Sequence, residues 1–338
     1  MIHNLELTNL RGIGSVSFED LGRVNLIIGG NNTGKTSVLE GLTLLFGSHP
    51  QLERLPTLFR QSANAQDNWT NFWPTLVRNQ DYEHFNLKTD TVMVTGQVTN
   101  NEAFLARRLY DIDSSSHDPN LDGRNAIIRI PGKNNGNVNA GHSTPTRKLS
   151  VLSTVQPDPK QTSALFNEIA PLNPENETKL EELLRVAIEP RLKRLRYAKL
   201  KGTQEHLIYA DLGSGPMIPF TQMGQAFARV LHIYCELFSV QPDILLVDEI
   251  ENGLYYDGLQ DFWKGLFTVL RDQDIQLFAT THSKECMETA QKADAQLDGS
   301  DLRFLRLDRH VDDLNNIIGT CFNSATMAEA MEVGQEMR

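Results

Sequence analysis

The sequence lacks the features that mark membrane-spanning and secreted proteins. No apolar run in its 338 residues approaches the length needed to cross a bilayer. The start, from Met1 to Glu6, has neither the basic nor the apolar region of a signal peptide. Three cysteines, Cys235, Cys286 and Cys321, lie far apart and at no metal-ligand spacing. These absences argue against a disulfide-stapled scaffold and predict a cytoplasmic protein with no membrane partner.

Positive charge is also scarce. The chain has 32 Lys and Arg against 43 Asp and Glu, a formal net charge of −11 at pH 7. Such a chain is no general nucleic-acid binder, although a local basic patch can still serve. The basic cluster of this sequence consists of Arg185, Arg191, Lys193, Arg194, Arg196, Lys199 and Lys201. Because acidic residues flank it and Tyr197 is its one aromatic residue, two interpretations stay open: a solvated helix face, or a contact with nucleic acid or an acidic partner.

What the sequence does have is a phosphate-binding motif. Val24 to Ile28 predicts a short buried strand, and apolar residues at helical spacing follow Lys35. Between them, Gly29 to Thr36 reads GGNNTGKT and fits GxxxxGK[ST] at every fixed position. Glycines let backbone N–H groups and a helix N-terminus surround phosphate oxygens. The predicted nucleotide-binding residues are Gly29, Gly30, Asn31, Asn32, Thr33, Gly34, Lys35, Thr36 and Ser37.

Each polar member of the motif has an expected role. Lys35 supplies a positive charge to the β- and γ-phosphates, and the Thr36 hydroxyl ligates Mg²⁺. A guanine-reading Asn-Lys-x-Asp is not found, since the nearest run, Gln291 to Asp294, lacks the Asn. We therefore expect ATP and Mg²⁺ as the ligands of this site.

Two further strands end in residues that suit phosphate chemistry. Ile244 to Val247 is continuously apolar and runs into Asp248 and Glu249. The carboxyl edge of an open α/β sheet is where ligands bind, so Asp248 is expected to hold Mg²⁺ and Glu249 to orient or deprotonate a water. A solvated acidic turn is the alternative. His282 ends the strand that begins at Ile275, and we expect it to hydrogen-bond the γ-phosphate rather than to be a core histidine.

Apolar strands alternate with helical patterns at both ends of the chain. This alternation indicates an α/β fold with a parallel sheet covered on both faces. The middle is less regular: Asp111 to Arg147 is rich in Ser, Asn, Gly and Asp, and Pro190 ends a helix that begins near Glu175. The expected division of one composite domain is an N-terminal lobe at 1–100, a loop-rich and helical insertion at 101–202, and a C-terminal lobe at 203–338.

Several of these segments together resemble a known family. Arg11-Gly12, the strand Val24–Gly29 and Asn31-Asn32 are similar to the RecF/SMC-type branch of ABC ATPases, and more narrowly to the AAA-15/AAA-21 ATPases related to bacterial OLD proteins. Ile244 to Leu254 resembles the Walker B and D-loop run of that family, and Phe278 to Ser283 resembles its switch-histidine segment. The resemblance covers roughly residues 1–50 and 215–338. It implies a P-loop NTPase fold of ABC/SMC-head type, with a parallel core, an antiparallel N-terminal β-part and an insertion.

The resemblance also implies an assembly. ATP is expected between two copies of the chain, with Lys35, Asp248, Glu249 and His282 from one copy and the signature loop Met223-Gly224-Gln225 from the other. Ala226 stands where the family has a second glycine, and its methyl group is expected to weaken that contact. Tyr255 stands where family members often carry His. For the Q-loop glutamine, Gln61 and Gln80 are both candidates.

The family context implies the biological role. The resemblance implies that this protein is the ATPase component of a bacterial anti-phage defence system and that it acts as a dimer or larger assembly. No acidic cluster follows the last family-like helix to build the Toprim nuclease site of OLD proteins, so a separately encoded effector protein is implied. Two alternatives stay open: a DNA repair or recombination ATPase, which the basic cluster favours, and a scaffold that binds ATP but hardly hydrolyses it, which Ala226 favours.

Overall fold

The computed structural model describes most of the chain outside the middle third. The described residues are 1–59, 72–78, 84–98, 102–109, 126–131, 147–154, 157–199, 206–311, 313 and 316–332. Within these ranges, none of the helices is both long and apolar enough to span a membrane.

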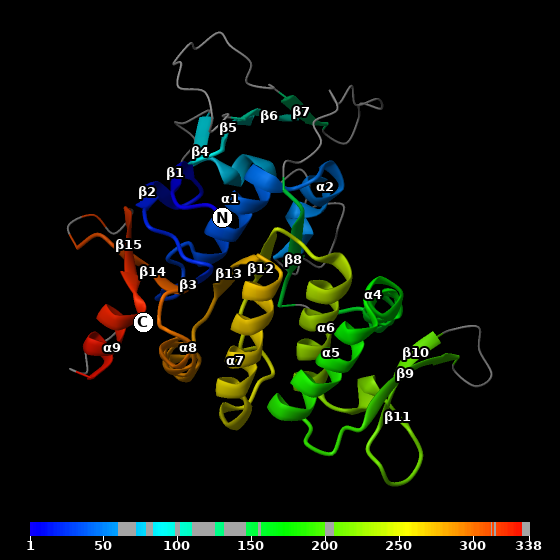
Figure 1. The fold of residues 1–338 in the computed structure, drawn as a ribbon. Coiled ribbons are helices and arrows are strands. Elements are labelled where there is room, and N and C mark those ends of the chain that lie inside the picture. The colour runs from blue at the N-terminus through cyan, green and yellow to red at the C-terminus, as the bar shows by residue number, and fades with distance from the viewer. Residues whose placement is uncertain are drawn as a thin grey trace.

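The centre of the molecule is a six-stranded sheet (Figure 1). Its strands, in spatial order, are β15 (Ile317–Asn323), β14 (Leu302–Arg309), β3 (Val24–Gly29), β13 (Gln276–Thr280), β12 (Ile244–Val247) and β8 (Leu149–Leu152). All neighbours are parallel except β15, which pairs antiparallel with β14. Successive residues of β12 enter different hydrophobic cores, Leu245 on one face and Leu246 on the other. Burial on both faces explains why these strands are continuously apolar in sequence.

A second sheet of six antiparallel strands lies beside the N-terminal half. Its spatial order is β2 (Ile13–Phe18), β1 (Leu5–Leu10), β4 (His84–Thr89), β5 (Val92–Val98), β6 (Glu102–Leu109) and β7 (Ala126–Pro131). Helix α1 (Lys35–Phe46) lies between the two sheets (Figure 1) and contacts strands of both. Val38 and Leu42 of α1 share one core with Leu7 of β1 and Phe278 of β13. This packing fixes α1, and therefore the P-loop before it, against both sheets.

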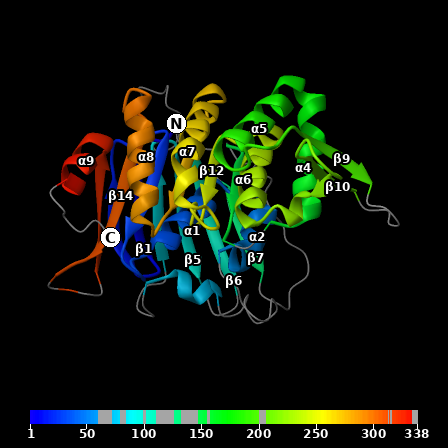
Figure 2. The same ribbon diagram turned by 90° about the horizontal axis from the view of Figure 1, so that it is seen from below.

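Helices cover the other face of the central sheet (Figure 2). The helices of this layer are α4 (Pro159–Leu172), α5 (Pro174–Ala187), α6 (Gln225–Cys235), α7 (Tyr256–Asp272) and α8 (Lys284–Gln296). A π-helical turn, η3 (Glu236–Val240), continues α6. At one end of this layer α9 (Ser324–Glu332) packs beside α8 (Figure 2) and places Met327 in the same core. Outside the layer lies α2 (His49–Leu58), and two short 3-10 turns are η1 (Trp73–Leu76) and η2 (Phe220–Gln222).

Part of the basic cluster lies on a small third sheet, β11 (Ile218–Pro219), β10 (His206–Asp211) and β9 (Arg194–Lys199), at one end of the molecule (Figure 1). Arg194, Arg196 and Lys199 are exposed on β9. Of the two open interpretations, a helix face fits only Arg185, because α5 ends at Ala187 and the chain then turns into β9. Lys201 lies outside the described residues.

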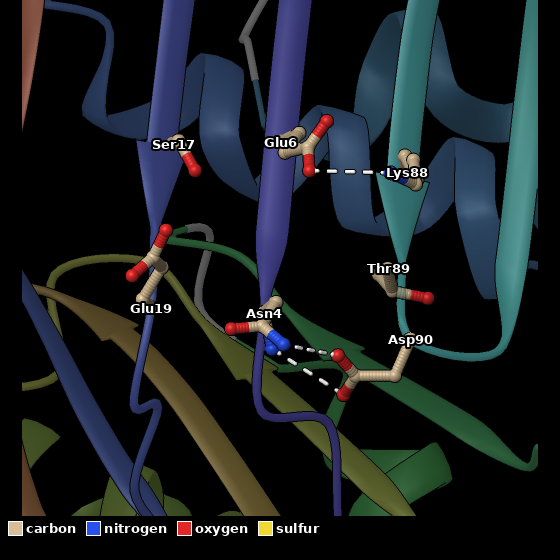
Figure 3. A pocket seen from close by; sticks show the side chains of 7 residues that line it. All are labelled: Asn4, Glu6, Ser17, Glu19, Lys88, Thr89 and Asp90. Carbon is tan, nitrogen blue, oxygen red and sulfur yellow. Dashed lines mark hydrogen bonds and ion pairs between the residues drawn. The ribbon is translucent and has the colours of Figure 1, made fainter.

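An open depression marks the N-terminal sheet (Figure 3), and polar side chains line it: Asn4, Glu6, Ser17, Glu19, Lys88, Thr89 and Asp90. Asp90 accepts hydrogen bonds from the Asn4 side chain at 2.6 Å and from the His3 backbone N–H at 2.5 Å. Lys88 pairs with Glu6 at 3.4 Å. These contacts join the start of the chain to β4, so we assign the depression a structural role.

The sequence expectations for the elements are largely confirmed. The strands β3, β12 and β13 and the helices α1, α5 and α7 form where periodicity places them. The α/β class, the parallel core and the antiparallel N-terminal part are also as predicted. The segment 101–202 contributes β6 and β7 to the antiparallel sheet and β8 to the central sheet. Most of the loop-rich stretch from 111 to 147 lies outside the described residues, and the three-part division stays a prediction.

Candidate nucleotide-binding site

The P-loop connects β3 to α1 and has the backbone conformation of an anion-binding turn. Gly29, Asn32 and Gly34 all have positive φ, at 139°, 58° and 91°. Gly34 is the N-cap of α1, so Lys35 and Thr36 begin the helix and its N-terminal N–H groups open into the loop. Lys35 as a residue is 5% exposed, and its ammonium donates to the carbonyls of Gly29 at 2.8 Å and Gly30 at 2.6 Å. The loop therefore holds its lysine inside its own turn.

The acidic pair Asp248-Glu249 follows β12, next to the end of β13. The Thr280 hydroxyl donates to an Asp248 carboxylate oxygen at 2.6 Å, and the Glu249 backbone N–H donates to the Thr280 hydroxyl at 2.8 Å. Glu249 has a φ of 48°, a conformation that costs free energy for a residue other than glycine. The parallel pairing of β12 with β13 thus brings both carboxylates to the edge of the sheet where the P-loop lies.

His282 lies at the same edge. A cavity of about 240 Å³ is lined by Ile28, Gly29, Gly30, Asn31, Thr281, His282 and Met287. The P-loop and the predicted switch histidine therefore face one space. The His282 backbone N–H donates to the Glu251 carboxylate at 2.9 Å, which holds the segment after β13 against the turn after β12.

Burial and mutual repulsion shape the charges of the site. Burial raises the pKa of Asp248 above its usual value, although the Thr280 hydrogen bond and the nearby Arg229 act in the opposite direction. Burial, Asp248 and Glu251 together raise the pKa of Glu249. Burial also lowers the pKa of Lys35, and Asp248 opposes that shift most strongly. These carboxylates repel one another, so a cation near them is electrostatically favoured.

The donor groups fit a magnesium ion. Asp248 is buried and accepts a hydrogen bond from Thr280, which pairs with Ile27 of β3, the strand that leads into the P-loop. A carboxylate and a hydroxyl, here from Asp248 and Thr36, are hard oxygen ligands of the kind Mg²⁺ prefers, with substrate phosphates and water completing the shell. In the described residues no cluster of three His, Cys, Asp or Glu side chains forms a metal cage.

The signature loop lies apart from this cavity. Gly224 has a φ of 93° and is the N-cap of α6, and a Cβ there would meet nothing within 4 Å. Gly224 and Gln225 are exposed, and both line a separate cavity of about 230 Å³. Gly253 packs on this loop, since its Cβ would lie 3.5 Å from the Ala226 backbone nitrogen. Ala226 is inside α6, so its methyl group lies on the first turn of a helix.

A buried arginine that sequence reasoning missed connects α6 to the acidic pair. Arg229 is 6% exposed and donates to the carbonyl oxygens of Asp248, at 2.9 Å, and of Ser153. Burial lowers the pKa of its guanidinium, while Asp248 and Glu249 act to raise it. The signal in the sequence is a cation within an otherwise apolar helix run, Phe227 to Cys235.

His232 lies one turn beyond Arg229 in α6, and because it is buried we expect it to make the stability of the fold depend on pH. It is 4% exposed, and its Nδ1 lies 3.0 Å from the Thr162 hydroxyl. Burial first, and then Arg229, lowers its pKa from 6.5 to about 4. The His232 imidazole therefore takes up a proton at higher pH in the unfolded chain than in the folded protein. Its contribution to folding stability is complete above pH 6.5 and is lost as the pH falls toward 4. Between pH 7 and pH 5 this group should lower the free energy of unfolding by about 2 kcal/mol.

Urea unfolding at the two pH values, on wild type and His232→Gln, measures this contribution. The wild type should lose more stability between pH 7 and pH 5 than the variant, whatever their absolute stabilities. The exposed His84 provides the control His84→Gln, which should keep the wild-type difference. An unchanged pH difference in His232→Gln would contradict the prediction.

The structure does not place the expected Q-loop glutamine. Both Q-loop candidates, Gln61 and Gln80, lie outside the described residues. The chain leaves the sheet edge after Leu152 of β8, the strand beside β12, and the next glutamine in the sequence is Gln156. Its position lies outside the described ranges as well. The sequence analysis missed β8, a four-residue strand without a strong pattern.

Two known proteins are similar to short stretches of this chain. A stretch of 74 residues is 28% identical to an "ATP/GTP phosphatase" of Helicobacter pylori and covers 21% of this chain and 20% of that protein. A stretch of 48 residues is 42% identical to "Uncharacterized protein MJECL10" of Methanocaldococcus jannaschii and covers 14% of this chain and 22% of that one. The chain thus spans about a fifth of the length of each relative.

The fold also matches a solved structure. The crystal structure of an SmcHead bound to the C-winged helix domain of ScpA aligns with a TM-score of 0.54, at 12% identity, over 98% of this chain and 99% of that chain. The family AAA_21, described as "AAA domain, putative AbiEii toxin, Type IV TA system", matches residues 24–288. Because this match covers well over half of the chain, the protein belongs to the AAA_21 family of AAA-domain ATPases and has the fold of an SMC head.

Proposed function

We propose that this protein binds ATP with Mg²⁺ and hydrolyses it. The observation that carries the proposal is the shared cavity, where the P-loop and His282 face one space beside Asp248 and Glu249. Membership of an ATPase family and the local similarity to an ATP/GTP phosphatase support it.

Each residue has a defined part in this proposal. The amides at the start of α1 and the Lys35 ammonium bind the β- and γ-phosphates, for which Lys35 exchanges its carbonyl partners for phosphate oxygens. Thr36 and Asp248 hold the magnesium ion, which neutralises phosphate charge. Glu249 orients and deprotonates the attacking water, and its raised pKa brings it closer to neutral pH than an ordinary carboxylate. His282 hydrogen-bonds the γ-phosphate.

We further propose that two copies enclose the nucleotide. In the signature loop, Gly224 and Gln225 are exposed at a helix N-terminus and line a different cavity from the P-loop. A second copy can bring such a loop to the ATP of the first. The SmcHead crystal structure is of a head bound to a partner protein, which makes partner binding by this fold a reasonable proposal here. Arg229 then connects the bound signature helix to Asp248 in the same copy.

The test compares wild type with Lys35→Ala. Without the ammonium, ATP affinity should fall by about 100-fold, because a charge-assisted contact to the phosphates is lost. Isothermal titration measures affinity, and light scattering measures solution mass with and without ATP·Mg²⁺. The wild type should turn over ATP and grow in mass with ATP, whereas Lys35→Ala, at an ATP concentration that just saturates the wild type, should do neither. Equal affinity in the two proteins would refute the P-loop assignment.

The biological setting is a separate proposal. Family membership supports a role as the ATPase component of a bacterial anti-phage defence system that acts with a separately encoded effector. The exposed cations of β9 favour the alternative, a DNA repair or recombination ATPase. Stimulation of ATP turnover by DNA, lost when Arg194 and Arg196 are changed to Gln, would favour the alternative.

A further inference from the structure

The strand β14 brings the distant C-terminal part of the chain to the P-loop. It runs parallel to β3, with Leu305 opposite Ile27 and Leu307 opposite Gly29. The approach is close, because a Cβ on Gly29 would lie 2.2 Å from the Leu307 carbonyl oxygen. Continuing this register by two residues places Arg309, the last residue of β14, beside the apex of the P-loop.

Arg309 bonds directly to the loop. Its Nη2 donates to the Asn32 carbonyl oxygen at 3.0 Å, across 277 positions of the sequence. Asn32 is exposed and has a left-handed φ of 58°, so this contact supports a conformation that an L-residue adopts at some cost. The neighbouring Asp308 carboxylate pairs with Arg306 at 2.7 Å. Arg309 and Asn32 are both exposed, so the guanidinium meets the loop at its solvent side.

Arg309 and His282 lie on opposite flanks of the loop. The central sheet has the order β14, β3, β13, so the P-loop, which follows β3, lies between the ends of the other two strands (Figure 1). His282 follows β13 on the flank that also carries Asp248, Glu249 and Glu251. The side of β14 is therefore the flank away from these carboxylates.

Charge balance indicates what Arg309 does there. ATP carries about four negative charges at neutral pH, and a magnesium ion with Lys35 offsets about three of them. The acidic flank adds negative charge instead of removing it. A guanidinium suits phosphate better than most groups, since its planar fork donates to two oxygens and keeps its charge.

We propose that Arg309 is a nucleotide-binding residue, which holds the P-loop at Asn32 and supplies positive charge to the triphosphate on the flank opposite His282. The inference rests on the proposed function, because it requires ATP in the P-loop. The ligand that Arg309 would contact is a nucleoside polyphosphate. The contribution of Arg309 to binding affinity should grow with the number of phosphates on that ligand.

The experiment measures affinities for ATP, ADP and AMP by titration calorimetry in wild type, Arg309→Gln and Arg309→Lys. Arg309→Gln should weaken ATP binding about tenfold and AMP binding much less, because the lost contact is to charge. Arg309→Lys should recover part of the ATP affinity, and the loss in Arg309→Gln should shrink at high salt. Arg303→Gln removes an arginine from the other end of β14, where it pairs with Asp20, and should leave the affinities unchanged.

The outcomes separate the two proposals. If wild type binds no ATP, the proposed function fails and the role of Arg309 fails with it. If wild type binds ATP and Arg309→Gln binds it equally well, the role of Arg309 alone is refuted. If Arg309→Gln weakens ATP, ADP and AMP to the same extent, and Arg309→Lys does not recover affinity, then Arg309 only supports the backbone of the loop and the charge contribution is refuted.

Discussion

Replacing Glu249 with Gln is expected to lower the ATP turnover number by about 10²- to 10³-fold, because an amide cannot accept the proton of the attacking water. The substitution keeps the size of the side chain, and the backbone N–H of residue 249 keeps its bond to Thr280. ATP affinity should therefore stay within about twofold of wild type, since the phosphate contacts of Lys35 are unaffected. Phosphate release measures turnover, and calorimetry measures affinity.

The same variant should trap the assembly. If ATP holds two copies together, Glu249→Gln should show a larger solution mass with ATP·Mg²⁺ than wild type at long incubation times. The control is Glu19→Gln, which removes a carboxylate from the depression of the N-terminal sheet (Figure 3) and should turn over ATP at the wild-type rate. A wild type that binds ATP but releases no phosphate would instead favour the ATP-gated scaffold.

Replacing Gly29 with Ala is expected to destabilise the protein by at least about 3 kcal/mol and to abolish ATP binding. The φ of Gly29 is 139°, which L-residues rarely adopt, and the added Cβ would lie 2.2 Å from the Leu307 backbone oxygen. A backbone atom in a paired strand cannot move aside, so β14 and β3 must separate locally. Urea unfolding measures the stability, and calorimetry measures ATP binding.

The neighbouring glycine provides a matched control. A Cβ on Gly30 would meet only the Thr33 methyl group, at 3.7 Å, an ordinary contact. Gly30→Ala should therefore change the free energy of unfolding by less than about 1 kcal/mol. If Gly29→Ala and Gly30→Ala are equally stable, β14 does not approach the P-loop as closely as the structure has it.

Local sequence patterns predicted the elements that carry the site. The P-loop, the apolar strand before Asp248 and the strand before His282 are short segments whose chemistry and periodicity are both visible in the sequence. β8 was missed because four residues carry too little periodicity to distinguish a strand. A helix face was one of two interpretations of the basic cluster, because charge patterns alone do not separate an exposed helix face from an exposed strand, and β9 is such a strand.

The P-loop, the α/β core and the acidic residues at strand ends can be read from the amino-acid sequence, because each depends on residues that are close along the chain. The bonds from Arg229 to the Asp248 carbonyl and from Arg309 to the Asn32 carbonyl become visible in the folded chain alone. Both contacts join segments that are far apart in sequence. The order of the strands in the central sheet creates them, and strand order follows from how the whole hydrophobic core packs, which no local pattern specifies.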